Sequence, residues 1–347
     1  MVGRERRRVC KEKMWFWLGY VALSVALIEF ALYRAQPLKD VEQEFAGTIK
    51  YQPFRRRDTH LWSRWRLYLV GIPLVLPRFL LILFCVFIHG LISTVVLAGL
   101  PLDPSIPLPP GRLKILNYSV YVWTRLLLWA AGFLWIVHRG TVDQRARTLV
   151  CNHSSWVDIM VFLTIDESPS FLANAGVKRM PLLGKIGQAL QCLYLDRSNK
   201  EDRSSALTLV QNRQLDLNSG KGFPKLLLFP EGTTTNGSGL LYFGKGAFVT
   251  RVPVQGVAVQ YPFSNFSPAF ESLPMLPHVL LLCCQAYNRI VVTHLPVLDL
   301  VAPTPEERAQ VVREQIAGFL RVPLLLDRFE EKFEFISHAY KQKVKHS

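Results

Sequence analysis

A short strand, a polar turn and a helix follow one another directly within residues 148–158, and this stretch constrains the fold more than any other. Thr148–Cys151 predicts a buried strand. The next apolar run, which starts near Trp156, predicts a helix. Two serines between them supply side-chain oxygens that can cap the start of this helix. His153 is therefore expected at a strand-to-helix turn.

His153 and Asp158 predict a base and the group that orients it. On one continuous helix a step of five residues would place them roughly 140° apart. Because His153 precedes the helix, its ring can turn back toward the carboxylate. A carboxylate that holds one ring nitrogen fixes the tautomer and leaves the other nitrogen free as a base. The alternative is a capping histidine beside a solvated aspartate.

Candidate strands and helices alternate from about residue 138 onward. Strands are expected at 148–151, 191–195, 225–229, 252–261 and 290–298. One helix is expected after a capping box formed by Ser198 and Glu201. Another is expected after Thr304, with the apolar face Val311, Val312, Ile316 and Phe319. This alternation predicts a layered α/β domain with a mostly parallel or mixed sheet.

A second polar turn follows the strand candidate at 225–229. Pro230 ends the strand, and Gly232 allows a close approach of the backbone. Glu231 and three threonines stand where a strand ends, which is the usual place for a site in an open α/β sheet. The alternative is an ordinary turn that contains glycine.

Long apolar runs in the first 140 residues indicate a membrane protein. Met14–Tyr33 has the length and the aromatic ends of a membrane helix. Leu67–Leu100 is interrupted by prolines and by Arg78, so it is either one span after Arg78 or a bent, re-entrant hairpin. Residues 115–137 fit an interfacial helix, the first helix of the domain, or a third span.

The formal net charge of +15 allows either a nucleic-acid-binding protein or a protein of an anionic membrane surface. The basic residues flank apolar segments, which favours the membrane and phosphate-bearing substrates over nucleic acid. The six cysteines have neither zinc-site nor disulfide spacing, so no metal is expected.

Four motifs resemble, in order, those of the glycerolipid acyltransferase family, over roughly residues 140–300. Asn152–Asp158 resembles the first motif and Leu193–Arg197 the second. Phe229–Thr233 resembles the third, and Val252–Val257, an apolar strand with its proline, resembles the fourth.

The resemblance implies a role for individual residues. His153 is implied as the general base, Asp158 as its orienter and Arg197 as the ligand of the acceptor's phosphate. A salt bridge with a neighbouring carboxylate is the alternative for Arg197. The third motif is implied to shape the acceptor site through Glu231, Gly232 and Thr233.

Further segments are most similar to the lysophosphatidylcholine/lysophosphatidylethanolamine acyltransferase branch, among them Gln260–Pro262 and Leu295–Val297. Gly256 stands where that branch usually has proline, and Phe270 where tryptophan is common. The implied reaction moves a fatty acyl chain from acyl-CoA, a co-substrate, to the free hydroxyl of a lysophospholipid, with no cofactor. The alternatives are acylation of lysophosphatidic acid or glycerol-3-phosphate, and a non-catalytic lipid-binding scaffold.

Two parts of the site are less defined by the sequence. The phosphates of CoA would meet basic side chains, for which the candidates are Lys178, Arg179, Lys185 and Lys245; a solvated basic face is the alternative. Donors for an oxyanion are expected from backbone amides near Gly232 or in the turn at 153–156.

The expected organisation is a membrane-anchored acyltransferase. It comprises a basic N-terminus (1–13), a transmembrane helix (14–33), a basic linker (34–66), a transmembrane or re-entrant segment (67–100), a proline-rich connector with an interfacial helix (101–137), the catalytic domain (138–325) and a basic C-terminal tail (326–347). Lys343 and Lys345 resemble a dilysine retrieval signal, which implies the endoplasmic reticulum and a catalytic domain facing the cytosol. An ordinary basic tail is the alternative.

Overall fold

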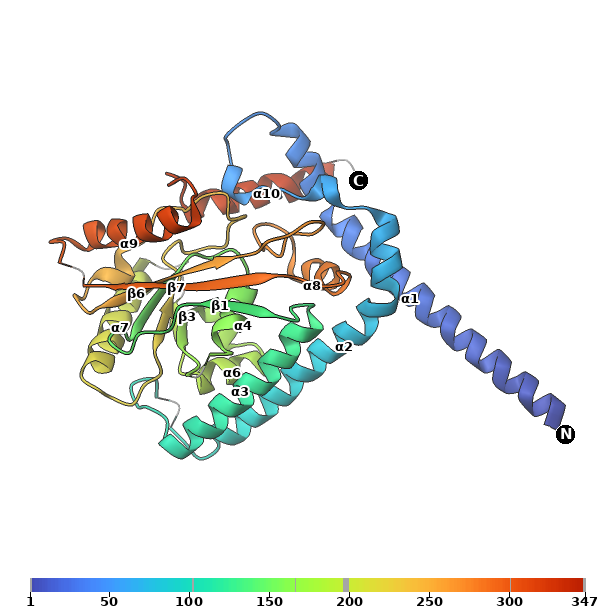
Figure 1. Cartoon of the computed structure of the whole chain (residues 1–347), viewed down its shortest axis with the longest axis horizontal. Helices are drawn as coiled ribbons and strands as arrows, with labels where there is room; N and C mark the ends of the chain where they lie inside the picture. The colour runs from blue at the N-terminus through green and yellow to red at the C-terminus, as the bar shows by residue number, and fades with distance from the viewer. Residues whose placement is uncertain (1, 102, 166, 196–199, 300, 346–347) are drawn as a thin grey trace.

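A computed structural model describes residues 2–101, 103–165, 167–195, 200–299 and 301–345. A seven-stranded mixed sheet lies at its centre, with helices on both sides, and one long helix projects from this body (Figure 1). The α/β class predicted from the alternation of strands and helices is confirmed.

The sheet brings the ends of its central strands to one edge. The strands are β1 (Ile136–Arg139), β2 (Thr148–Cys151), β3 (Ser170–Asn174), β4 (Leu193–Leu195), β5 (Leu226–Leu228), β6 (Val254–Gln260) and β7 (Ile290–Leu298). Their order is β1-β7-β6-β2-β5-β3-β4. Strands β2 to β6 are mutually parallel, whereas β7 runs antiparallel to β6. The segments that follow β2, β5 and β6 therefore leave the sheet at the same edge.

Two strands were not predicted, β1 and β3. Strand β1 occupies the end of the segment at 115–137, which was expected to be helical throughout. The helix there, α3 (Pro110–Ala130), stops before Gly132, whose φ of +88° leaves the helical region. Beyond that residue the chain pairs in parallel with β7 from Ile136.

Alternate side chains of β2 enter different cores, as expected for a strand buried on both faces. Leu149 and Cys151 pack with α4 (Val157–Phe162) and α8 (Met275–Cys283). Val150 points the other way and joins the core formed with α7 (Lys200–Asn218) and α9 (Pro305–Leu320).

Further helical segments of the domain are short or lie at its periphery. They are α5 (Ala175–Lys178), α6 (Leu183–Ala189), α10 (Phe329–Lys345) and the 3-10 turns η1 (Gln52–Phe54), η2 (Thr59–Leu61) and η3 (Lys245–Phe248). The predicted start of α9 after Thr304 is confirmed, and a capping box holds it: the Thr304 hydroxyl accepts from the Glu307 N–H and the Glu307 carboxylate accepts from the Thr304 N–H. The predicted face of α9 is half right: Val312 and Ile316 are buried, but Val311 and Phe319 are exposed. Ser198 lies outside the described residues.

Among the described residues, two N-terminal helices are long and apolar enough to cross a membrane. The first is the Val9–Glu44 part of α1 (Val2–Glu44), and the second is α2 (Arg64–Leu97). Helix α1 continues through the first part of the predicted linker, and α2 is one continuous helix rather than a re-entrant hairpin.

Helix α2 tolerates its internal prolines because another group replaces a lost hydrogen bond. Pro77 has no N–H, so the carbonyl of Pro73 lacks its helical donor. The Tyr20 hydroxyl of α1 donates to that carbonyl at 2.8 Å. The same helix is tied to the domain by Arg78, whose guanidinium donates to carbonyls at the end of α8.

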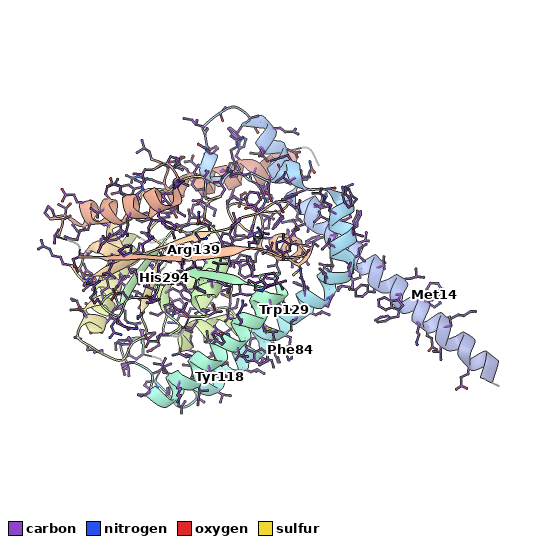
Figure 2. The ribbon with its side chains drawn as sticks, viewed as in Figure 1. Met14, Phe84, Tyr118, Trp129, Arg139 and His294 are labelled. Carbon is purple, nitrogen blue, oxygen red and sulfur yellow. The ribbon has the colours of Figure 1, made fainter. Side chains whose placement is uncertain are left out.

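Apolar side chains remain on the outside of these helices. Met14, Phe84, Tyr118 and Trp129 are each at least half exposed and lie along α1, α2 and α3 (Figure 2). Exposed apolar surface of this extent is typical of contact with lipid or another protein.

The segment expected as a basic C-terminal tail contains α10, which is part of the folded body (Figure 1). Phe335 of α10 is buried, and the His338 Nε2 lies 3.0 Å from the Glu44 carboxylate at the end of α1. The buried Lys332 ammonium donates to the carbonyl and hydroxyl oxygens of Thr234 at 2.9 and 2.7 Å. The C-terminal segment therefore contacts the second polar turn.

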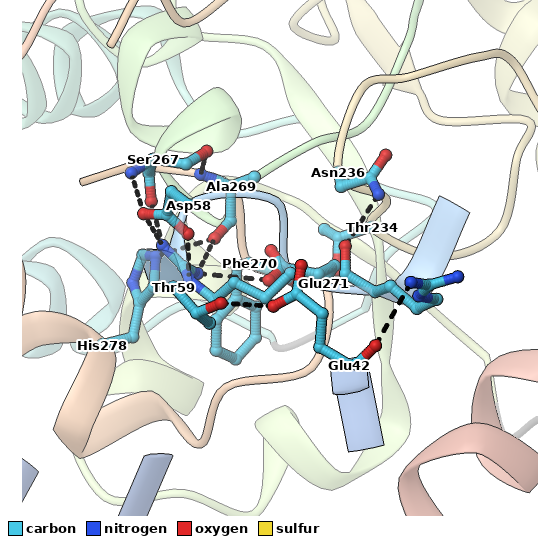
Figure 3. A network of polar contacts seen from close by, with 12 residues as sticks. Glu42, Asp58, Thr59, Thr234, Asn236, Ser267, Ala269, Phe270, Glu271 and His278 are labelled. Atoms are coloured by element: carbon cyan, nitrogen blue, oxygen red, sulfur yellow. Dashed lines mark hydrogen bonds and ion pairs between the residues drawn. The ribbon is translucent and has the colours of Figure 1, made fainter. Parts of the chain in front are cut away.

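Part of the predicted linker is bound inside the domain through Arg56, whose side chain is fully buried. The Arg56 guanidinium contacts Asp58 at 2.8 Å and Glu271 at 3.2 Å, and it donates to the Ala269 carbonyl at 3.0 Å. Asp58 and Glu271 are both buried, and Figure 3 shows them on segments far apart in sequence. One cation thus faces two buried carboxyl groups.

Glu271 is the carboxyl group of this cluster whose neutral form burial favours. Within the described residues its Oε2 has no hydrogen-bond partner, whereas Asp58 also accepts from the Trp62 indole and the Ser267 N–H. Burial raises the pKa of Glu271 to about 7, and Arg56 acts against this rise. A pKa raised on folding stabilises the fold at low pH, and this contribution is lost as pH rises through about 7.

We therefore expect Glu271→Gln to unfold with less dependence on pH than the wild type. At pH 8 the variant should be more stable by about 1–3 kcal/mol, because it removes the cost of a buried second negative charge. Near pH 5 the two proteins should be similar. Thermal unfolding at both pH values measures this, with the exposed Glu330→Gln as control. An identical pH dependence in Glu271→Gln and wild type would contradict the assignment.

Candidate active site

His153 is positioned by the residue before it. Strand β2 ends at Cys151, but the Asn152 side chain continues the pairing with β6. Its Nδ2 donates to the Val259 carbonyl at 3.0 Å, and its Oδ1 accepts from the Val259 N–H at 2.8 Å. The Asn152 side chain thus extends the hydrogen bonding between β2 and β6 by one residue, and the chain turns away from the sheet at His153.

The predicted contact between His153 and Asp158 is present. His153 Nδ1 lies 2.9 Å from Asp158 Oδ2. An ionised carboxylate only accepts, so Nδ1 donates in this contact and Nε2 is left for another partner. The imidazole stacks on Phe229 with ring centroids 4.0 Å apart, and 15% of the side chain is exposed. The arrangement leaves the second ring nitrogen available as a base.

Asp158 also organises the turn that precedes its own helix. Its carboxylate is fully buried, and Oδ2 accepts from the N–H groups of Ser154 and Ser155 at 2.8 and 2.9 Å. The predicted serine capping is limited to the Ser155 hydroxyl, which accepts from the Val157 N–H at 3.3 Å. Together with the His153 ring nitrogen, the Ser154 and Ser155 amides give Oδ2 three hydrogen-bond partners.

Glu231 is held inside the protein between two backbone segments. It is buried, its Oε1 accepts from the His153 N–H at 2.7 Å, and its Oε2 accepts from the Leu241 N–H at 3.1 Å. Burial raises the pKa of Glu231 to about 8, while the two N–H donors act in the opposite direction. Glu231 therefore holds the backbone of His153, and its part in shaping the acceptor site stays a prediction.

The rest of the second turn is held on several sides. Gly232 adopts a φ of +74°, which only glycine adopts easily, and Thr233 is half-buried beside it. The Thr235 N–H donates to the His153 carbonyl at 2.9 Å. The Asn236 amide donates to two carbonyls of the 52–55 segment, both at 2.7 Å. This turn therefore fixes His153 and the N-terminal segment together.

The site lies in a part of the chain that matches a known protein family. Residues 137–260 match the family model described as Acyltransferase, and this range contains His153, Asp158 and Glu231. The chain carries an acyltransferase domain. The segment from Asn152 to the end of α4 and the turn after β5 thus lie in the part of the chain that matches the family model.

Similar proteins carry names of one enzyme class. Lysophospholipid acyltransferase LPEAT2 of Arabidopsis thaliana is 30% identical over 281 residues, which are 80% of this chain and 50% of that protein. Lysophospholipid acyltransferase LPCAT4 of Xenopus tropicalis is 30% identical over 277 residues, 77% of this chain and 51% of that protein. The chain spans about half the length of these relatives.

A solved structure shares the fold. The 1-acyl-sn-glycerophosphate acyltransferase PlsC of Thermotoga maritima matches with a TM-score of 0.52 and 18% sequence identity. The match covers 71% of this chain and 95% of that one. The layered sheet with its helices is therefore the fold of the acyltransferase domain.

Four of the amides expected to stabilise an oxyanion have partners within the protein. The N–H groups of His153, Ser154 and Ser155 donate to the carboxylates of Glu231 and Asp158. The Gly232 N–H donates to the Phe229 carbonyl at 3.0 Å. The source of the oxyanion donors stays a prediction.

The predicted basic ligands are dispersed. Arg197 lies outside the described residues; the strand before it, β4, ends at Leu195. Lys178 lies over the Tyr194 ring at 5.7 Å, and Lys245 forms an exposed ion pair with Glu306 at 3.0 Å. The other two candidates are an exposed arginine and a half-buried lysine, Arg179 and Lys185. The CoA contact stays a prediction for all of them.

Tyr261 is a site residue that was not identified from the sequence as part of the machinery. It follows β6, and its hydroxyl donates to Asp158 Oδ1. Its separation of 103 residues from Asp158 gives no local signal. Only the order of the strands, which places β6 beside β2, brings the two together.

Proposed function

We propose that this protein transfers a fatty acyl chain from acyl-CoA to the free hydroxyl of a lysophospholipid, either lysophosphatidylcholine or lysophosphatidylethanolamine. The observation that carries the proposal is the 2.9 Å contact by which Asp158 orients the His153 ring within an acyltransferase domain. The names of the similar proteins support the lysophospholipid as acceptor.

The reaction follows from the state of His153. Nε2 takes the proton of the acceptor hydroxyl as its oxygen attacks the thioester carbonyl. The C–S bond then breaks, and CoA leaves as a thiol after taking the proton from the imidazolium. Asp158 stabilises the imidazolium while it exists. General-base help of this kind contributes about 10²–10⁴-fold, and holding the two substrates together contributes much of the rest.

The N-terminal helices support action at a bilayer. Both candidate spans connect to the domain, and the exposed apolar side chains of α2 and α3 lie on the same body as the site (Figure 2). The protein is accordingly proposed as an integral membrane enzyme of the endoplasmic reticulum, with its domain on the cytosolic side. Arg197 is proposed to bind the acceptor's phosphate, and Gly232 and Thr233 to border the acceptor.

The test is acyl transfer from labelled acyl-CoA to a panel of acceptors by the purified protein. The panel contains lysophosphatidylcholine, lysophosphatidylethanolamine, lysophosphatidic acid and glycerol-3-phosphate. Product with either of the first two supports the proposal. Product only with lysophosphatidic acid or glycerol-3-phosphate would replace the acceptor. Lipid binding without any transfer would favour a scaffold.

For Asp158→Asn we expect kcat to fall about 10²-fold or more with little change in the KM for acyl-CoA. The amide keeps the shape of the carboxylate but loses the charge that stabilises the imidazolium. Steady-state kinetics measure both constants. Asp216→Asn is the matched control, since Asp216 forms a surface ion pair with Lys221. An Asp158→Asn protein with unchanged kcat would exclude Asp158 as the orienting group.

A further inference from the structure

We propose that Tyr261 is a positioning residue for the His153–Asp158 pair, a role that rests on the proposed function. The two oxygens of Asp158 have different partners. Oδ2 accepts from His153 Nδ1 and from two main-chain N–H groups, whereas Oδ1 accepts from the Tyr261 hydroxyl. The tyrosine hydroxyl thus holds Oδ1, whereas the contacts from the 153–155 turn are all to Oδ2.

The fold delivers the hydroxyl to this point through the sheet. Strand β6 lies beside β2 and ends at Gln260, so Tyr261 leaves the sheet next to the segment that carries His153. The paired hydrogen bonds between Asn152 and Val259 lock the two strands one residue beyond β2. The Tyr261 ring also packs edge-on against Phe133, with centroids 6.1 Å apart. Strand register and ring packing together hold the phenol in place.

The hydroxyl remains a donor under all working conditions. Burial, followed by the neighbouring Asp158 carboxylate, raises the pKa of Tyr261 well above its ordinary value. A protonated phenol can donate to Oδ1 and stop the carboxylate from rotating about its Cβ–Cγ bond. Because Nδ1 of His153 is bonded to the other oxygen, a fixed carboxylate also fixes the plane of the imidazole.

Removal of the Tyr261 hydroxyl should change the proton affinity of the His153 imidazole without removing a contact to either substrate. In Tyr261→Phe, Oδ1 loses its donor and more negative charge remains on the carboxylate. The protonated imidazole is then favoured, so the acidic limb of the pH–rate profile moves to higher pH. We expect kcat to fall about tenfold, the size of one hydrogen bond to a charged group, with unchanged KM for acyl-CoA and for the lysophospholipid.

The experiment compares wild type, Tyr261→Phe and Tyr340→Phe. Within the described residues the Tyr340 hydroxyl has no hydrogen-bond partner, so the control removes a buried hydroxyl that holds nothing. Kinetics across pH give kcat, KM and the acidic limb. The pH dependence of diethylpyrocarbonate labelling of His153, followed by mass spectrometry, reports the same change in protonation without turnover.

A labelling midpoint at higher pH in Tyr261→Phe alone supports the proposal, even if wild type transfers no acyl chain to any acceptor. The latter result would count against the proposed function only. An unchanged or lower midpoint in Tyr261→Phe would overturn the positioning role. So would a loss of kcat that comes with a lower Tm and no shift of the acidic limb, because that pattern describes a purely structural tyrosine.

Discussion

His153→Ala is expected to lower kcat for acyl transfer by about 10²–10⁴-fold, to near the background rate, because it removes the imidazole that is proposed to take the acceptor's proton. The fold should survive. The backbone of His153, which accepts from Thr235 and donates to Glu231, carries the structural contacts of this residue and is kept in alanine. The imidazole itself contributes the bond to Asp158 and the stack on Phe229.

The measurement is transfer of labelled acyl groups to lysophospholipid, together with membrane fractionation and thermal unfolding of the same preparation. His60→Ala is the matched control, since His60 is exposed on the short turn η2. Activity retained in His153→Ala would remove the base assignment. Loss of both activity and membrane association would instead indicate that the variant is unfolded.

Arg56→Met is expected to destabilise the protein by about 3–5 kcal/mol, the usual cost of leaving a buried charge without its partner. Arg56 is the cation that faces Asp58 and Glu271, and its guanidinium also lies 4.4 Å from the centre of the Phe266 ring. Methionine fills a similar space but leaves the Asp58 carboxylate buried without its ion pair. The N-terminal segment should then detach from the loop around Glu271.

Thermal unfolding in detergent and limited proteolysis between α1 and α2 measure this effect. Arg57→Met is the matched control, because Arg57 is exposed and its replacement removes the same charge from the chain. Equal stability of Arg56→Met and Arg57→Met would show that the cluster contributes nothing to the fold. Selective cleavage of Arg56→Met would locate the damage at the N-terminal segment.

The sequence was most informative where a feature depends on neighbours in the chain. The strand at 148–151, the turn after it and the contact between His153 and Asp158 all lie within eleven residues, so periodicity and polarity predict them. The cap of α9 is local for the same reason. The short strand β3 was missed because five residues without clear alternation carry little periodic signal.

The roles of Glu231, Arg56 and Tyr261 were decided by the tertiary structure. Glu231 is predicted to shape the acceptor site, and only the fold shows that it holds the main chain of His153, 78 residues away in sequence. Arg56 lies in the predicted basic linker, and only the fold shows that it binds Glu271 across 215 residues. Residue type and spacing thus determined which groups do the chemistry. Strand order determined what holds them, because only the folded sheet sets which distant segments become neighbours.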